Sequence, residues 1–359
     1  MNRLVIIGNG FDLAHGLKTS YKDFIDWYWE ERLKDMLTEH SDVSSDCLCT
    51  FKIIAEDSFG WQSVVSNKDY YDIFNRKWKF PAKDIIEGIA NNEENFYVEL
   101  CPFFYNITKN IETKGWVDIE NEYYQLLKKN ADKTDECKKL NGQLKFIQDK
   151  LVEYLKTQDR TVKIDAIYKL IYDKFYLDDF CVSMKSIEDD DPGNVLIINF
   201  NYTNTAWLYN NERNALIYDI HGSLENPEEI IFGYGDELDK KYQDILDKND
   251  NELLRYMKNV KYLEAANYKT ILQIIETALF QVYIMGHSCG NSDRTLLNTI
   301  FEHKNCVSIK PFYYKKPDGT DNYLEIVQNI SRNFTKTKLF RDRVVNKTRC
   351  IPLPQSQKQ

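Results

Sequence analysis

Four clusters of small and polar residues each follow a short apolar run, at the places where strands of a parallel sheet would end. The clusters are Gly8-Asn9-Gly10-Phe11-Asp12, Asn199-Phe200-Asn201-Tyr202-Thr203, His221-Gly222-Ser223, and Gly286-His287-Ser288-Cys289-Gly290 with Asp293 beyond. In an open parallel sheet, ligands bind beyond the carboxyl ends of the strands, because helix N-termini and backbone amides converge there. The four clusters together predict one nucleotide-sized pocket at this edge.

Each cluster alone is a weak signal. Gly8 and Gly10 begin a G-x-G-x-x-G pattern, but Leu13 occupies the third glycine position, so a tight strand-to-helix turn explains the pattern equally well. Asn201 alone is typical of a turn or a helix cap, and a lone His221 is more often structural than catalytic. Their common placement favours a binding site.

The last cluster also fits G-x-S-x-G, the pattern of a serine hydrolase with Ser288 as the nucleophile. Such an enzyme needs a later histidine, and His303 is the only one. It would lie at the far end of the following helix, roughly 15 Å away at 1.5 Å per residue. We therefore do not expect a Ser-His-Asp triad.

A metal site is not expected either. His287 and Cys289 would lie at the carboxyl end of one strand, and His303 and Cys306 at the amino end of the next, on opposite edges of the sheet. The eight cysteines contain no C-x-x-C pair, which argues against a disulfide scaffold or a zinc ribbon.

Five short apolar segments supply the strands that these clusters follow. They are Arg3–Ile7, Val195–Phe200, Leu216–Ile220, Gln281–Met285 and Cys306–Tyr313. Helical stretches such as Thr203–Asn211 and Asp293–His303 separate the later strands, which is the rhythm of β-α-β units. We predict an α/β fold with helices on both faces of a Rossmann-like parallel sheet.

The chain between the first two strands carries apolar residues at helical spacing. The expected helices are Ser20–Met36, Trp116–Lys129, Glu136–Lys156 and Lys163–Asp178. We expect a mainly helical insertion at 30–185 inside a Rossmann-like nucleotide-binding domain formed by 1–29 and 186–359. The insertion is our candidate for a gate, a sensor or an oligomer contact.

Composition excludes several classes of protein. The chain has 359 residues, 43% of them hydrophobic, which is enough to bury a large core and excludes disorder as a whole-chain description. A net charge of −9 opposes broad binding to nucleic acid or to an anionic membrane. The apolar run Leu4–Ile7 is too short for a signal-peptide core, and no stretch of about 18 apolar residues follows. We expect a cytoplasmic protein without a membrane partner.

Several motifs resemble those of the bacteriophage abortive-infection AbiH family. They are LVIIGNGFDLAHGLKTSYKDF (Leu4–Phe24), W-x-D-x-E at Trp116–Glu120, NFNYTNT (Asn199–Thr205), YDIHGS (Tyr218–Ser223), IFGYG (Ile231–Gly235) and YIMGHSCGNSD (Tyr283–Asp293). The resemblance implies an anti-phage defence protein with a phage-derived trigger. The carboxylates of Asp118 and Glu120 suit a helix start, which is the simpler explanation of the second motif.

The same series of motifs is more distantly similar to the sirtuin superfamily, which implies NAD as the ligand. By that resemblance Asn201 would position the ribose and the attacking water, and His221 would be the base. The residues implied to contact NAD are Gly8, Asn9, Gly10, Phe11, Asp12, Thr19, Tyr21, Phe24, Asn199, Gly222, Gly286, His287, Ser288 and Asp293. Thr203 replaces the sirtuin aspartate, and no four-cysteine zinc module is present, so protein deacylation is not expected.

The resemblance thus implies an NAD⁺ glycohydrolase that forms nicotinamide and ADP-ribose on infection and requires no metal. NAD or a related nucleotide is the expected small-molecule partner, and a second copy of the chain is the expected protein partner. Two alternatives stay open: a non-catalytic nucleotide-sensing module, and an effector of abortive infection directed at nucleic acid.

Overall fold

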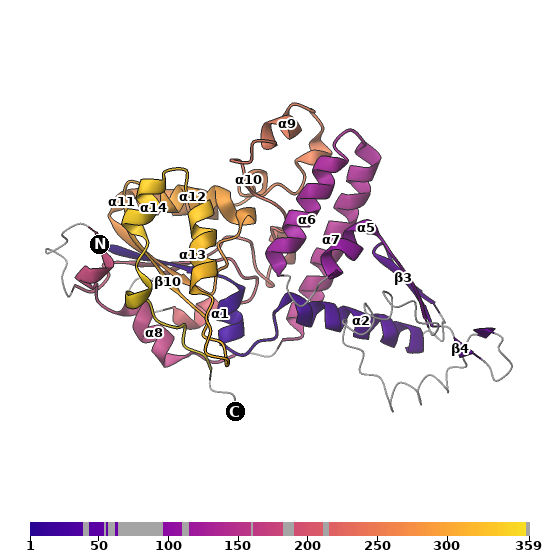
Figure 1. Cartoon of the computed structure of the whole chain (residues 1–359), viewed down its shortest axis with the longest axis horizontal. Coiled ribbons are helices and arrows are strands. Elements are labelled where there is room, and N and C mark those ends of the chain that lie inside the picture. Colours follow the sequence, from indigo (N-terminus) through magenta and orange to yellow (C-terminus); the bar gives the residue numbers. More distant parts are fainter. Residues whose placement is uncertain are drawn as a thin grey trace. The chain divides into compact units, whose positions relative to one another are not determined.

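The computed structural model describes residues 1–38, 43–53, 55–56, 62–63, 96–109, 115–158, 161–181, 190–210 and 215–356 (Figure 1). The chain divides into two compact units. Met1–Thr19 and Leu155–Gln359 form the sheet unit, and Ser20–Tyr154 forms the insertion unit. The expected domain boundaries at residues 30 and 185 stay a prediction.

A five-stranded, all-parallel sheet forms the centre of the sheet unit. Its strands are β1 (Asn2–Ile7), β7 (Val195–Asn199), β8 (Ala215–Asp219), β9 (Phe280–Met285) and β10 (Cys306–Phe312). They lie in the order β10-β9-β1-β7-β8. Every residue of β1 is buried, as expected of a strand covered on both faces. The predicted α/β class and the five predicted strands are confirmed, each strand end within one residue.

Alternate residues of β1 pack against different helices. Leu4 and Ile6 pack with α11 (Asn267–Thr277), α12 (Arg294–Phe301) and α13 (Tyr323–Arg332). Val5 and Ile7 pack with α1 (Asn9–Ala14), α8 (Asp165–Tyr172) and the 3-10 helix η4 (Thr205–Tyr209). The sheet is therefore the middle layer of three, and Figure 1 shows α8 and α12 on its opposite sides.

Shorter elements complete the sheet unit. They are η2 (Leu177–Asp179), η5 (Pro227–Glu229), α9 (Tyr242–Leu246), η6 (Asn251–Leu253), α10 (Lys258–Lys261), η7 (Asn291–Asp293), α14 (Thr337–Arg343) and η8 (Lys347–Arg349). Of these, α10 and η7 contribute residues to the candidate site.

Two predicted helices are shorter than expected. The helix predicted at Lys163–Asp178 ends at Tyr172, because the guanidinium of Arg3 binds the carbonyls of Ile171 and Asp173, which a continuing helix would use. The helix predicted at Thr203–Asn211 is only the 3-10 turn η4, since contacts of Thr203 with the sheet edge fix its start.

The insertion unit contains three of the four helices predicted for the insertion, and also strands that the sequence did not reveal; the fourth predicted helix is α8 of the sheet unit. Its helices are α2 (Tyr21–Thr38), α5 (Pro102–Thr108), α6 (Trp116–Lys129) and α7 (Thr134–Lys156), of which the last two residues are assigned to the sheet unit. Its strands are β2 (Val43–Ser45), β3 (Cys49–Ile53) and β6 (Phe96–Leu100), which form an antiparallel sheet, and the pair β4 (Ala55–Glu56) and β5 (Gln62–Ser63). Among the residues described, no helix has the length and apolar character needed to cross a membrane.

Candidate functional site

Strand register brings the four polar turns to one edge of the sheet. Ile7, the last residue of β1, pairs with Asn199 on one side and Met285 on the other. Asn199 in turn pairs with Asp219. The turns that follow β1, β7, β8 and β9 therefore begin at the same level, as the sequence predicted.

A buried group of charged and titratable side chains, here called the edge cluster, surrounds Asp293. It consists of Asp293, Lys258, His221 and His287. Lys258 Nζ donates to Asp293 Oδ1 at 2.7 Å, and His221 Nε2 lies 3.3 Å from the same oxygen. His287 Nε2 lies 3.5 Å from Asp293 Oδ2. One carboxylate from η7 thus joins residues of three other segments.

The contacts of the edge cluster fix the protonation of its histidines. A carboxylate is an acceptor only, so each Nε2 that faces Asp293 carries a proton. His287 Nδ1 accepts the backbone N–H of Cys289 at 2.9 Å, so this ring is the neutral Nε2–H tautomer. The Nε2 of His221 also lies 3.1 Å from the Tyr262 hydroxyl, which leaves Nδ1 as its basic nitrogen.

Burial and neighbouring charges shift the pKa values of His221 and Asp293 in the edge cluster, and both pKa values are lowered. Burial, together with the Lys258 ammonium, lowers the pKa of His221 from 6.5 to about 4. Burial alone would raise the pKa of Asp293, but Lys258 and the hydrogen bonds from both histidines hold it well below its usual range. At neutral pH the cluster therefore contains a neutral His221 and a charged Asp293.

The first and fourth turns pack backbone against backbone. A Cβ on Gly8 would lie 2.7 Å from His287 Cα, and one on Gly10 would lie 2.9 Å from Gly286 Cα, so only glycine fits at either position. The Gly10 amide donates to Gly286 O at 2.8 Å, and the Phe11 amide donates to Gly8 O at 2.8 Å. A phosphate at this turn would have to replace these hydrogen bonds.

Asparagine side chains connect the first, second and third turns. Asn201 Nδ2 donates to Gly8 O at 3.0 Å, and its backbone N–H donates to Asn199 Oδ1 at 3.1 Å. Asn199 Nδ2 donates to Asp219 Oδ1 at 2.8 Å. Both candidate asparagines thus hold the edge together, and Asp219 is brought into the site.

Asp12 is a buried carboxyl group behind the second turn. Thr203 Oγ1 donates to Asp12 Oδ2 at 2.7 Å, whereas Oδ1 accepts no hydrogen bond of normal geometry among the described residues. Burial raises the pKa of Asp12 from 3.8 to about 6, and the Thr203 hydrogen bond opposes the rise. Among the described residues, no Lys, Arg or His forms an ion pair with this carboxyl group.

A cavity of about 400 Å³ opens beside the second and third turns. That volume is within the range of about 300–1,000 Å³ typical of ligand pockets. Its lining residues are Leu17, Leu155, Gln158, Thr161, Tyr202, Thr203, Asn204, Thr205, Trp207, Asp219, Ser223, Leu224 and Glu225. The ring centroid of Tyr202 is 6.5 Å from that of His221, which connects the cavity to the edge cluster.

The remaining candidates occupy varied positions in the sheet unit. Phe11 is in the core, where its ring packs against Tyr209, and Asn9 is the first residue of α1. Thr19 is buried, and Ser288 is exposed. Gly222 turns the chain after His221 at φ +80°, where a Cβ would lie 2.6 Å from Glu229 O.

Tyr21 and Phe24 belong to the insertion unit and are buried within it. The Tyr21 hydroxyl donates to Ile107 O at 2.9 Å, and both rings pack against Trp116. Asp118 caps the start of α6 by accepting the Gly115 amide at 2.7 Å, which agrees with the simpler explanation of that motif.

Among the described contacts, no histidine and carboxylate form a catalytic triad with Ser288, which the serine-hydrolase alternative would require. His303 Nε2 lies 3.1 Å from Glu276 Oε1, and its ring stacks on Phe280 at the start of β9. This position is at the amino end of the strand whose carboxyl end precedes Ser288.

Sequence reasoning missed three residues of the site. Lys258 and Tyr262 lie in a charged helical stretch without a recognisable motif, and only the fold brings them to His221. Asp219 directly precedes Ile220 and His221 in YDIHGS, and its place at the end of a strand could have singled it out.

The fold and the site define an α/β protein with a parallel sheet, four polar turns at one edge, and a titratable cluster beside a cavity. The family model described as bacteriophage abortive infection AbiH matches residues 4–314, so the chain belongs to this family. Membership implies a role in defence by abortive infection. Neither the curated proteins nor the solved structures include a significant match.

Proposed function

We propose that this AbiH protein acts in the cytoplasm as an NAD⁺ glycohydrolase during phage infection, with its site at the carboxyl edge of the sheet. The observation that carries the proposal is the edge cluster, in which a neutral His221 is held by Asp293 beside the turn that contains Asn201. Strongly shifted pKa values in a buried charged cluster are typical of functional sites.

Strand order supports a Rossmann-like nucleotide site at this edge. From β1 the sheet extends through β7 to β8 on one side and through β9 to β10 on the other. In open α/β sheets, ligands bind beyond the carboxyl ends where the strand order reverses direction. The turns after β1 and β9 lie at this switch point, and the turns after β7 and β8 carry the polar side chains.

The proposed reaction breaks the bond between the nicotinamide nitrogen and the ribose anomeric carbon of NAD⁺. The bonding electrons neutralise the pyridinium ring, so the leaving group needs no acid. A water oxygen bonds to the anomeric carbon, and its proton passes to His221 Nδ1 and then to solvent. The products are nicotinamide, ADP-ribose and a proton.

The edge cluster supplies groups suited to this step. Asp293 holds the His221 ring through Nε2 and stabilises the imidazolium that forms when Nδ1 takes a proton. The side-chain amide of Asn201 donates to Gly8 O in the first turn. When this hydrogen bond breaks, the amide would orient the ribose and the water. We propose that the backbone amides of Gly8 and Gly10 bind the NAD⁺ phosphates. For Gly10, this requires that its hydrogen bond to Gly286 O breaks first.

The test is turnover of NAD by purified protein, with and without lysate from phage-infected cells. Chromatography would resolve nicotinamide, ADP-ribose and cyclic products. We expect His221→Ala to reduce turnover by about 10²- to 10⁴-fold, the usual contribution of a general base. Asn201→Ala should also lose turnover.

His303→Ala is the matched control, because His303 lies outside the edge cluster and pairs with Glu276. It should keep the wild-type rate. Wild-type turnover in folded His221→Ala protein would refute the assignment of the base.

A nucleotide-sensing module without catalysis is the second candidate. His221 is 4% exposed and is held by Tyr262 and Asp293, an arrangement suited to a switch that ligand binding rearranges. This function predicts that NAD raises the melting temperature of the protein while no product forms.

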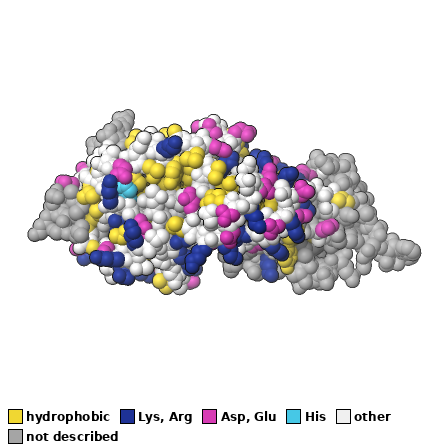
Figure 2. All heavy atoms as spheres, turned by 90° about the horizontal axis from the view of Figure 1, so that it is seen from above, with side chains coloured by type: hydrophobic (Ala, Val, Ile, Leu, Met, Phe, Trp, Pro, Cys, Tyr) yellow, Lys and Arg dark blue, Asp and Glu magenta, His cyan; other side chains and the backbone are white. Residues whose placement is uncertain are grey.

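The nucleic-acid alternative has less support. Figure 2 shows basic side chains interspersed with acidic ones on the face that it displays, in place of a continuous basic field. Together with the net charge of −9, this pattern disfavours binding to a phosphate backbone.

A further inference from the structure

The cavity beside the second and third turns differs in charge from a phosphate site. Its lining includes two carboxylates, Asp219 and Glu225, and none of its lining residues is Lys, Arg or His. Phosphate sites in proteins use cationic side chains or free backbone amides. The field of this lining therefore favours a cationic ligand and disfavours an anionic one.

Aromatic rings line the same cavity. Trp207 is 46% exposed, which is unusual for an indole without a partner surface, and Tyr202 forms another part of the wall. The negative faces of Trp and Tyr rings attract cations and stack on flat heteroaromatic groups. Apolar side chains of Leu17, Leu155 and Leu224 complete a lining that suits a ring.

The carboxylate of Asp219 is fixed in orientation. Trp207 Nε1 donates to Asp219 Oδ2 at 3.0 Å, and Asn199 Nδ2 donates to Oδ1 at 2.8 Å. Each oxygen keeps a second lone pair for a ligand. Burial raises the pKa of Asp219, and the hydrogen bonds from Asn199 and Trp207 oppose the rise. A preoriented carboxylate beside an indole is a recognition element for a flat cation.

We propose that this cavity binds a heteroaromatic cation of up to nucleoside size, held by the ring of Trp207 and the carboxylate of Asp219, and that it excludes phosphate. In one respect the inference rests on the proposed function: if NAD⁺ is the substrate, the group bound here is its pyridinium ring. Binding of the isolated cation does not depend on that reaction.

The experiment titrates the full-length protein with the 1-methylnicotinamide cation and follows tryptophan fluorescence and heat of binding. Neutral nicotinamide has the same ring without the charge, and AMP carries a phosphate. We expect the cation to bind at least tenfold more tightly than nicotinamide, and AMP to compete with neither. Equal binding of cation and nicotinamide, or no binding of the cation by folded protein, would overturn the inference.

Variants test the two named contacts. Asp219→Asn keeps the shape of the side chain and should weaken binding of the cation at least tenfold, while nicotinamide binding stays the same. Trp207→Leu should abolish the fluorescence response and the binding. Glu225→Gln changes an exposed side chain of the lining and should weaken cation binding about two- to threefold. Glu228→Gln, exposed and outside the lining, is the matched control and should bind as wild type.

Parallel NAD turnover separates the two proposals. Cation binding without turnover under any condition would keep this inference and refute the hydrolase. Turnover in protein that does not bind the cation would keep the hydrolase and refute this inference.

Discussion

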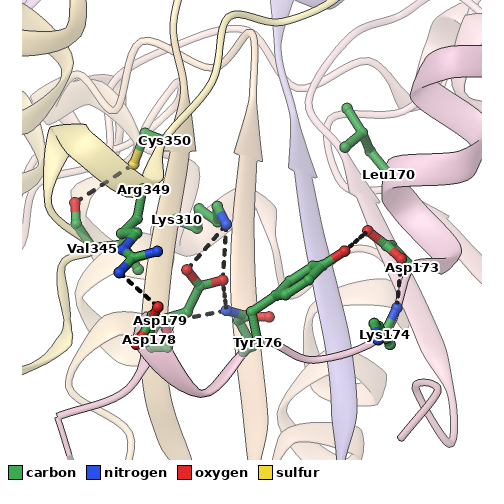
Figure 3. Close-up of polar contacts among 12 residues, drawn as sticks. Leu170, Asp173, Lys174, Tyr176, Asp178, Asp179, Lys310, Val345, Arg349 and Cys350 are labelled. Atoms are coloured by element: carbon green, nitrogen blue, oxygen red, sulfur yellow. Dashed lines mark hydrogen bonds and ion pairs between the residues drawn. The ribbon is translucent and has the colours of Figure 1, made fainter. Parts of the chain in front are cut away.

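Two buried charge networks in the sheet unit have opposite character. The edge cluster around Asp293 lies at the carboxyl ends of the strands. The second network, here called the clamp network, consists of Arg3, Asp179, Gln281, Ser308 and Lys310, and Arg3 and Gln281 lie near the amino ends of their strands. Figure 3 shows its ion pair between Lys310 and Asp179. In the edge cluster, the carboxylate of Asp293 contacts a lysine and two histidines. In the clamp network, Lys310 pairs with Asp179, and the Arg3 guanidinium donates to backbone carbonyls and to Gln281.

The clamp network fastens the segment after α8 to the sheet. Lys310 Nζ donates to both oxygens of Asp179, at 3.0 and 2.9 Å, and Ser308 Oγ donates to Asp179 O at 2.8 Å. The Arg3 guanidinium donates to Ile171 O at 3.1 Å and lies 4.3 Å from the ring centroid of Tyr283. These contacts have fixed geometry and involve no neutral base, which indicates a structural role.

Both networks contain buried charged side chains, so buried charge alone does not identify a functional site. The edge cluster differs in containing a histidine whose pKa burial lowers to about 4, near a cavity and at the carboxyl edge of the sheet.

Lys310→Met should give the largest loss of stability. It leaves the carboxylate of Asp179 buried without its cation, and removing one partner of a buried ion pair costs about 3–5 kcal/mol. Chemical denaturation would measure the free energy of unfolding. Binding of the 1-methylnicotinamide cation, measured under native conditions, should stay unchanged. If the Lys310→Met variant is as stable as wild type but no longer binds the cation, the clamp network would have a functional role in place of a structural one.

The two perturbed groups of the carboxyl edge should produce opposite pH dependences of stability. The folded pKa of His221, about 4, lies below its usual 6.5, so its contribution to stability is lost as the pH falls from 6.5 to 4. The folded pKa of Asp12, about 6, lies above its usual 3.8, so its contribution increases as the pH falls from 6 to 4. At 1.36 kcal/mol per pKa unit, each contribution is about 3 kcal/mol.

Single variants should separate these contributions. Between pH 6.5 and 4, His221→Gln should lose less stability than wild type, and Asp12→Asn should lose more. Denaturant titrations at several pH values would give both differences. If stability depends on pH in the same way for wild type and for one of the variants, the pKa of the replaced group is not shifted in the folded state.

Arg349→Met should have the smallest effect. Arg349 pairs with Asp178 at 2.7 Å beside the clamp network, but both side chains are more than half exposed (Figure 3). Exposed ion pairs contribute about 0–1 kcal/mol. The same denaturation experiment should find a change below about 1 kcal/mol, and a loss as large as that of Lys310→Met would place this pair within the clamp network.

The sequence predicted those parts of the molecule that local patterns encode. Continuous apolar runs such as Val195–Asn199 identify strands buried on both faces, and the turns that follow them identified the carboxyl edge. The end of α8 could not be foreseen, because it depends on Arg3, far away in the chain. Lys258 reaches Asp293 only through the fold, and the short strands β2, β3 and β6 lack a long apolar pattern.

NAD hydrolysis with His221 as the base is tested most directly by measuring the NAD concentration in infected cells that carry wild-type protein or the His221→Ala variant. NAD should fall after infection only in cells with the wild-type protein, and nicotinamide and ADP-ribose should rise in the same cells. Protection against phage by the wild-type protein at a constant NAD concentration would show that NAD hydrolysis is not its defence activity.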